Sequence, residues 1–188
     1  KTGGGCRASN YIFLLRKALK NAGMGQVPVV SVNLSGLEKN SGFKITLPLL
    51  RRALAALTYG NLLMLLRNQT RPYDKNPGET DALVDKWVDD ICARFLKGKG
   101  FQKKQIRTLT REIVASFDRI EILPVKKIRV GIVGEIYAKY SPLANNHLED
   151  FLRSQDCEVN VPGIMAFMLF KVDNRLEDIK LYGGNPLK

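Results

Sequence analysis

The residues best suited to chemistry lie in two short glycine-containing motifs. The first, Gly3-Gly4-Gly5-Cys6-Arg7, comes directly before a predicted helix. Its glycines let the backbone adopt positive φ and approach a cofactor closely. The thiol of Cys6 would lie at a helix amino terminus, where N–H groups and the helix dipole stabilise a thiolate. Metals and iron–sulfur clusters bind thiolates, so Cys6 is a candidate metal ligand and Gly5 and Arg7 are candidate cofactor-binding residues. A glycine linker before a small buried cysteine is the alternative.

The second motif, Gly131-Ile132-Val133-Gly134-Glu135-Ile136-Tyr137, lies where a predicted strand ends and a helix follows. Ligands of open α/β sheets bind at the carboxyl ends of strands, so Gly134, Glu135 and Tyr137 are candidate cofactor-binding residues. We expect this loop to face a cleft, with Glu135 and Tyr137 directed towards Cys6. The dinucleotide pattern GxGxxG is absent. A tight strand–loop junction without a ligand remains equally open.

Other reactive residues are predicted to be structural. Trp87 lies on an apolar helix stripe, and Cys92 and Cys157 are expected to be packed thiols. His147 is the only histidine and has no second ligand at metal-binding spacing. The sequence contains no phosphate-binding P-loop, no GxSxG motif and no HExxH motif. We therefore assign no catalytic residue.

Hydrophobic periodicity supplies the elements that would position these motifs. Predicted helices cover 8–22, 47–67, a segment from Thr80 to a break at 97–100, 102–118 and 143–154, and predicted strands cover 27–32, 127–136 and 158–161. A polar loop is expected at 33–42, and the apolar segment 164–172 fits helix or strand. These elements predict an α/β class: one Rossmann-like three-layer domain over 1–188, with a parallel sheet and a helical insertion at about 45–118.

Composition and charge narrow the function classes. The net charge is +12, and residues 1–75 carry 12 Lys or Arg against only two acids, Glu38 and Asp74. A basic half favours an acidic partner, although solubility alone also accounts for it. Leu47–Arg67 contains Gly60, Asn61 and three arginines, so we expect it to pack on other helices and not to cross a membrane. Without a signal peptide or initiating methionine, the chain is expected to be a cytoplasmic part of a longer protein.

Four motifs, in order, resemble one protein family. They are Gly3-Gly4-Gly5-Cys6-Arg7-Ala8-Ser9-Asn10-Tyr11; Val27-Pro28-Val29-Val30-Ser31; Arg71-Pro72-Tyr73 with Gly78-Glu79-Thr80-Asp81; and Val130 to Tyr137 with Pro142-Leu143-Ala144-Asn145-Asn146. The family is the large activator-like proteins of 2-hydroxyacyl-CoA dehydratases, from anaerobic bacteria. The chain resembles their carboxyl-terminal region, which is similar to dehydratase subunits and to double-cubane cluster reductases.

The resemblance implies ATP-driven, low-potential electron transfer through a cysteine-held iron–sulfur cluster. It implies that Cys6 is a cluster ligand and that Gly134, Glu135 and Tyr137 line a cleft between two Rossmann-like domains. Further thiolates and an ATPase domain would belong to the remainder of the same longer chain, so the isolated segment is expected to be inactive and free of cluster. A dehydratase subunit is a further expected partner, and nucleic acid and membrane are not. The leading alternative is a non-catalytic interaction module whose basic half docks an acidic partner, and a nucleic-acid binder is suggested by charge alone.

Overall fold

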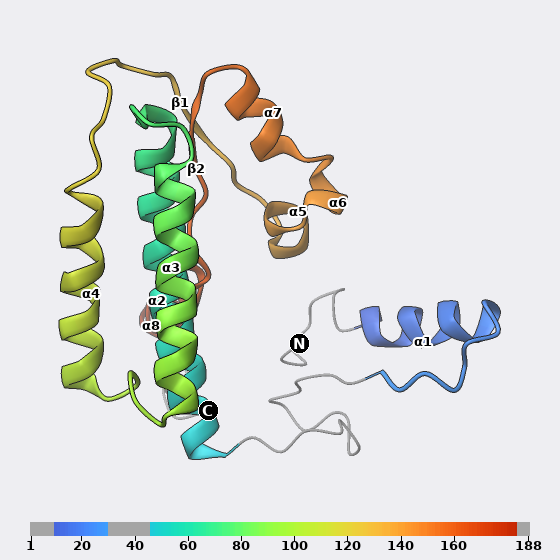
Figure 1. The fold of residues 1–188 in the computed structure, drawn as a ribbon. Coiled ribbons are helices and arrows are strands. Elements are labelled where there is room, and N and C mark those ends of the chain that lie inside the picture. Colours follow the sequence, from blue (N-terminus) through green and yellow to red (C-terminus); the bar gives the residue numbers. More distant parts are fainter. Residues whose placement is uncertain (1–9, 30–45, 184–188) are drawn as a thin grey trace. The chain divides into compact units, whose positions relative to one another are not determined.

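The computed structural model describes residues 10–29 and 46–183. The chain divides into two compact units, Lys1–Leu50 and Arg51–Lys188. In the first unit, helix α1 (Tyr11–Asn21) confirms the predicted helix over its described part (Figure 1). It ends before Gly23, whose φ of 72° is a conformation that glycine adopts at little cost. No residue of α1 is buried.

The strand expected at 27–32 is wrong over its described part, because residues 27–29 are not in a strand. Pro28 has no backbone N–H to donate to a strand ladder, which weakens this segment as a strand. Residues 30–32 and the polar loop at 33–42 lie outside the described residues.

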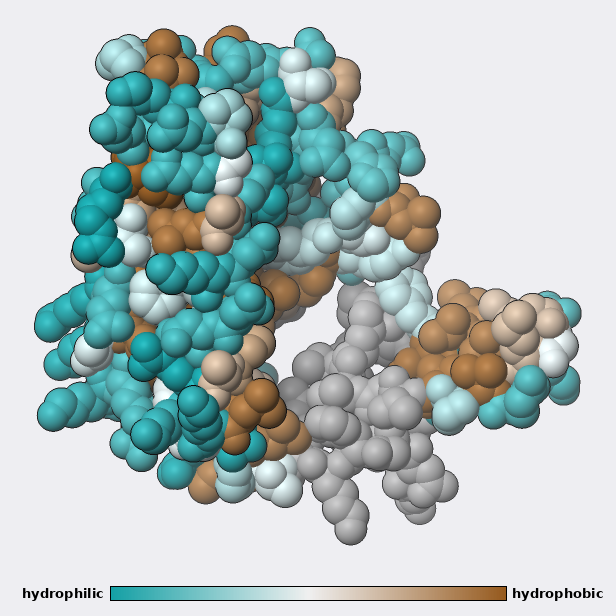
Figure 2. All heavy atoms as spheres, viewed as in Figure 1, coloured by the Kyte–Doolittle hydropathy of each residue, from teal (hydrophilic) through white to brown (hydrophobic). Residues whose placement is uncertain are grey.

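Three long helices dominate the second unit: α2 (Leu47–Thr70), which enters this unit at Arg51, α3 (Glu79–Leu96) and α4 (Lys103–Phe117). They lie side by side (Figure 1). A single 3-10 turn, η2 (Arg71–Tyr73), follows α2. All three helices were predicted, with ends shifted by a few residues. Their shared core is formed by the buried residues Ala55, Tyr59, Leu63, Ile91, Leu109, Ile113, Phe117 and Ile120. Figure 2 shows hydrophilic side chains over much of the visible face of this bundle.

Helix α2 packs one face against α3 and α4, as the sequence predicted. It runs without interruption through Gly60 and Asn61. The stretch Leu47–Tyr73 is also long and apolar enough to cross a membrane by length and composition, with a mean hydropathy of 1.3. Only 17% of the most apolar 18-residue part of this stretch is buried. The helix therefore keeps exposed apolar surface beside its packed face.

The bundle core corrects one expectation and refines another. Cys92 was expected to be a packed thiol, but it is exposed on α3, because the buried face of that helix passes through Ile91. Trp87 packs partly buried against the core, as expected. Its indole N–H donates a hydrogen bond of 2.8 Å to the hydroxyl of Ser116.

A small parallel sheet follows the bundle, so the described residues are mostly helical with one two-stranded parallel sheet, an arrangement compatible with the expected α/β class. Strands β1 (Arg129–Gly131) and β2 (Glu158–Asn160) pair in register, with Val130 opposite Val159. Between them lie the short helices α5 (Ile136–Tyr140), α6 (Pro142–Asn145) and α7 (Leu148–Ser154). A second core combines Ile132, Val159 and Val161 with Tyr140, Leu148 and Leu152. The predicted strand–helix–strand order is therefore confirmed, with two strands among the described residues.

Two boundaries differ from the sequence expectation. The strand predicted over 127–136 stops at Gly131, and Ile136 already begins α5. The helix predicted over 143–154 is broken at Asn146 and His147, whose φ values are 53° and 56°. Asn145 supports this break, because its side-chain oxygen accepts the N–H of Leu148 at 3.2 Å.

The ambiguous segment after the sheet is helical. Helix α8 (Ile164–Tyr182) begins directly after Gly163. A Cβ at Gly163 would lie 2.7 Å from the side-chain oxygen of Asn61, so a larger residue there would require the Asn61 side chain on α2 to shift. The single-domain boundary at 1–188 and the insertion at about 45–118 stay predictions.

The bundle core predicts a contrast between two neighbouring residues of α4. Ile113→Ala should lower the free energy of unfolding by about 2–5 kcal/mol, because the fully buried side chain would leave a cavity. Val114→Ala is the control: Val114 is 38% exposed, and its truncation should change stability by less than about 1 kcal/mol. Urea unfolding followed by circular dichroism measures both. Equal effects would contradict the assignment of the core face of α4.

Candidate functional site

The loop after β1 is shaped by Gly134 and Glu135. Gly134 has a φ of 141°, which side-chain-bearing residues rarely adopt. The carboxylate of Glu135 accepts the backbone N–H of Tyr137 at 2.7 Å and that of Ala138 at 3.3 Å. Glu135 therefore caps α5, and its carboxylate is directed at its own backbone. Tyr137 follows with half of its surface exposed.

The other predicted site residues, Gly5, Cys6 and Arg7, lie outside the described residues. The expected approach of Glu135 and Tyr137 to Cys6 stays a prediction. What the structure brings together at this loop is a glycine-dependent turn and a capped helix start directly after a parallel strand.

Gly134 and Gly131 form a matched pair for testing this loop. Gly134→Ala should destabilise the fold by about 1–3 kcal/mol through backbone strain, because its φ is strongly positive although no atom lies within 4 Å of the added Cβ. Gly131→Ala meets equally open space without a positive φ, so it should be close to neutral. Thermal unfolding of both variants measures the difference, and a neutral Gly134→Ala would refute the constrained turn.

A cavity of about 790 Å³ with both polar and apolar walls lies at the other end of the sheet. Arg129 and Glu158 are the first residues of β1 and β2, so the cavity borders the amino ends of the strands. Its lining joins the bundle to the sheet and consists of Gln69, Tyr73, Ile122, Leu123, Pro124, Val125, Lys126, Lys127, Arg129 and Glu158. The sequence motifs indicated a site at the carboxyl ends of the strands and gave no sign of this cavity.

Glu158 is the central group of the cavity wall. It is only 4% exposed, and its Oε2 accepts the hydroxyl of Tyr73 at 2.6 Å and Nε of Arg129 at 3.0 Å. The hydrogen bond to Glu158, with burial and the carboxylate's charge, raises the pKa of Tyr73 above its ordinary value of 10.0. The Nζ of Lys127 lies 5.9 Å from the centre of the Tyr73 ring. This cluster can hold a polar ligand by hydrogen bonds and charge, and it also fastens η2 to β2.

The segment Arg71 to Asp81, which carries part of the family resemblance, organises this region. Asp81 accepts Nε of Arg67 at 2.6 Å and Nε of Arg71 at 3.0 Å, which joins the end of α2 to α3. Asp74 accepts the backbone N–H of the fully buried Thr80 at 3.1 Å, near the start of α3. These residues therefore hold Tyr73 in position for Glu158.

No signal in the sequence pairs Tyr73 with Glu158, because 85 residues separate them. Only the motif around Tyr73 could have indicated that the tyrosine matters.

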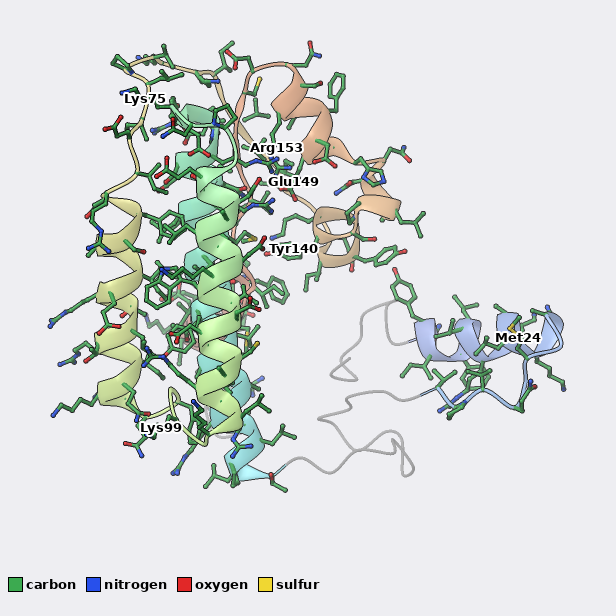
Figure 3. The ribbon with its side chains drawn as sticks, in the orientation of Figure 1. Met24, Lys75, Lys99, Tyr140, Glu149 and Arg153 are labelled. Atoms are coloured by element: carbon green, nitrogen blue, oxygen red, sulfur yellow. The ribbon has the colours of Figure 1, made fainter. Side chains whose placement is uncertain are left out.

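The described residues do not fit an iron–sulfur cluster. They contain no group of three or more His, Cys, Asp or Glu that could hold a metal ion. Cys92 is on the surface of α3, and the Sγ of Cys157 lies 3.5 Å from the carbonyl oxygen of Gln155. His147 is exposed, and its Nδ1 lies 3.4 Å from Oδ2 of Asp150. A neighbouring acid of that helix, Glu149, pairs with Arg153 at 2.8 Å (Figure 3).

Comparison with known proteins adds no relative: no protein-family model, curated protein or solved structure matches the chain.

The cluster around Glu158 predicts a pH-dependent loss of stability. Tyr73→Phe should lower the free energy of unfolding near pH 7 by about 1–3 kcal/mol, because it removes a hydrogen bond to a buried carboxylate. The raised pKa means that the folded state keeps the Tyr73 proton above pH 10, where the unfolded state loses it. Stability from this bond is thus complete below about pH 9 and falls as pH rises through 10 and above.

The measurement is the difference in unfolding free energy between the original chain and Tyr73→Phe from pH 7 to pH 11. The difference should shrink across the upper part of this range. Tyr182→Phe is the control, because Tyr182 is 82% exposed, and its difference should stay near zero throughout. A Tyr73→Phe effect that is constant with pH would contradict the bond.

Proposed function

We propose that the chain is the α/β region of an activator-like protein of 2-hydroxyacyl-CoA dehydratases, or of a related iron–sulfur reductase, that takes part in ATP-driven low-potential electron transfer. One observation carries this proposal: the Gly134-Glu135-Ile136-Tyr137 motif of the resemblance follows β1 of a parallel strand pair, at the edge where α/β proteins bind ligands. The positive φ of Gly134, which a side-chain-bearing residue would adopt only with strain, supports a specific requirement for glycine there.

In this proposal the short sheet is part of a Rossmann-like three-layer domain whose other strands come from residues outside those described. Gly134, Glu135 and Tyr137 would border the cleft, with the Glu135 carboxylate fixing the loop through the start of α5. The bundle of α2, α3 and α4 would hold the sheet through Tyr73 and Glu158. No catalytic residue is assigned.

A cluster would need thiolates beyond the described residues, with Cys6 as one ligand and the others from elsewhere in a longer cytoplasmic protein. The same longer chain would contain the ATPase domain, and a dehydratase subunit would receive the electrons. The segment alone is therefore expected to be inactive.

A second function is favoured by a separate observation, the basic run across the α3–α4 junction. Residues 91–111 contain seven Lys or Arg and no Asp or Glu. Such a surface fits an interaction module that docks an acidic partner.

The proposed iron–sulfur cluster predicts different roles for the three cysteines. In the full-length protein, purified without oxygen, Cys6→Ser should lower iron and sulfide per chain and bleach the charge-transfer absorption. Cys92→Ser and Cys157→Ser are matched controls, because the described residues around them offer no metal-binding group, and both should keep the full cluster.

The 188-residue segment alone should be colourless and bind no stoichiometric iron, since it supplies too few suitable thiolates. Full iron content in Cys6→Ser would remove Cys6 from the ligand set. An iron-free full-length protein would overturn the cluster proposal as a whole.

A further inference from the structure

A shallow groove runs between α2 and α4. Its first part holds about 510 Å³, and its second part, which shares Thr58, holds about 430 Å³. The first part is lined by Arg51, Leu54, Ala55, Thr58, Phe101, Gln102, Lys103 and Ile106. The second is lined by Thr58, Leu62, Thr110, Arg111, Val114, Ala115 and Asp118. Because both parts follow the same two helices, the groove extends along about 24 Å of α4 at 1.5 Å per residue.

The floor of the groove is apolar and partly open to solvent. Leu54 is 40% exposed and Val114 is 38% exposed, although both lie beside the buried core of the bundle. Apolar residues from two helices thus form one strip that no other element of the described residues covers. A strip of this kind fits the apolar face of a third helix.

The rim of the groove is basic. Arg51, Lys103 and Arg111 line it, and among the described residues none of them makes an ion pair. Lys99, at the end of the bundle opposite Lys75, adds charge nearby (Figure 3). The one acid of the lining, Asp118, lies at the far end.

The basic end of the groove is held rigid by the loop between α3 and α4. The hydroxyl of Tyr59, which is 1% exposed, donates to the carbonyl of Gly100 at 2.6 Å. The side chain of Gln105 accepts the N–H of Gly100 at 2.9 Å, and the Phe101 ring packs edge-on against Phe95 at 6.2 Å. A preformed groove loses little conformational entropy when a ligand binds.

We propose that this groove is the docking site for an acidic amphipathic helix of a protein partner. The apolar strip would receive its leucine-type side chains, and Arg51, Lys103 and Arg111 would pair with flanking Asp or Glu. A nucleic acid would use the cations but not the apolar floor, and a membrane surface would favour protruding apolar residues over a concave strip. This docking proposal is separate from the proposed iron–sulfur function, because no groove residue belongs to the Gly134 loop or to the Cys6 motif.

The test uses a fluorescently labelled helical peptide of 16 residues, with Leu at positions i, i+3, i+4 and i+7 and Glu flanking this face. Anisotropy should report saturable binding to the chain that weakens as salt rises from about 0.05 to 0.3 M, since exposed charges are screened. Replacing the peptide's Glu by Gln, or its Leu by Ser, should each weaken binding at least about fivefold. Either change without effect overturns the proposal.

Protein variants locate the site. Lys103→Glu and Leu54→Gln should each weaken peptide binding at least about fivefold. Lys86→Glu, on the exposed surface of α3 outside the groove, makes the same charge change and should leave binding within about twofold. Circular dichroism and thermal unfolding confirm that each variant is folded. Equal weakening by Lys86→Glu and Lys103→Glu would mean that net charge, and not the groove, binds the peptide.

Three further measurements address other occupants. Single-stranded RNA or vesicles with anionic lipids that compete for the groove more strongly than the peptide would overturn the assignment to a protein helix. Light scattering that shows a dimer lost on Leu54→Gln would assign the groove to a second copy of the chain instead. A monomer that ignores RNA and vesicles but binds the acidic peptide supports the proposal.

Discussion

The arrangement of the second unit depends on one buried carboxylate, that of Glu158. A carboxylate removed from water is stable only when it is paired and hydrogen-bonded, and Tyr73 and Arg129 supply both partners. Arg129 comes from the neighbouring strand, whereas Tyr73 comes from the turn after α2. The same oxygen atom therefore joins the strand pair within the sheet and fastens the helical bundle to it. Removing either partner would leave Glu158 incompletely paired, so the junction is held as a unit.

Helix α2 makes this junction possible because it contacts the start of α3 through Arg67 and the loop between α3 and α4 through Tyr59. At its carboxyl end, Arg67 pairs with Asp81, and so does Arg71 of the adjoining η2; together they fix the position of Tyr73. Near its middle, the buried Tyr59 reaches the carbonyl of Gly100 and holds the loop between α3 and α4. One face of the helix is therefore committed to the fold at both ends of the bundle. The face beside Leu54 makes no comparable connection among the described residues, which leaves it open for an interaction.

The helices could be predicted from sequence because their apolar residues recur at helical spacing over 15 to 24 residues. The strands of the sheet were harder to predict from the sequence. Strands of three residues give little periodicity, so β1 was predicted too long, and its end at Gly131 was not located. The break at Asn146 and His147 depends on two successive residues in the left-handed region, which helix propensity does not register. The exposure of Cys92 depends on which side of α3 packs against the core, and this is set by tertiary packing and not by the local sequence.

In the candidate site, too, features set by neighbouring residues could be predicted from the sequence, whereas contacts between distant residues could not. The turn at Gly134 and the cap by Glu135 are local, and the sequence located them because glycine and an acidic residue before a helix have direct physical meanings. The pairing of Tyr73 with Glu158 joins residues 85 positions apart, and each alone looks like an ordinary surface residue. Polar residues that meet only after folding give no periodic signal, and here they lie at the opposite edge of the sheet from the motif loop. The amino ends of the strands are therefore where the sheet is anchored to the bundle, and the loop that Gly134 and Glu135 shape lies at their carboxyl ends.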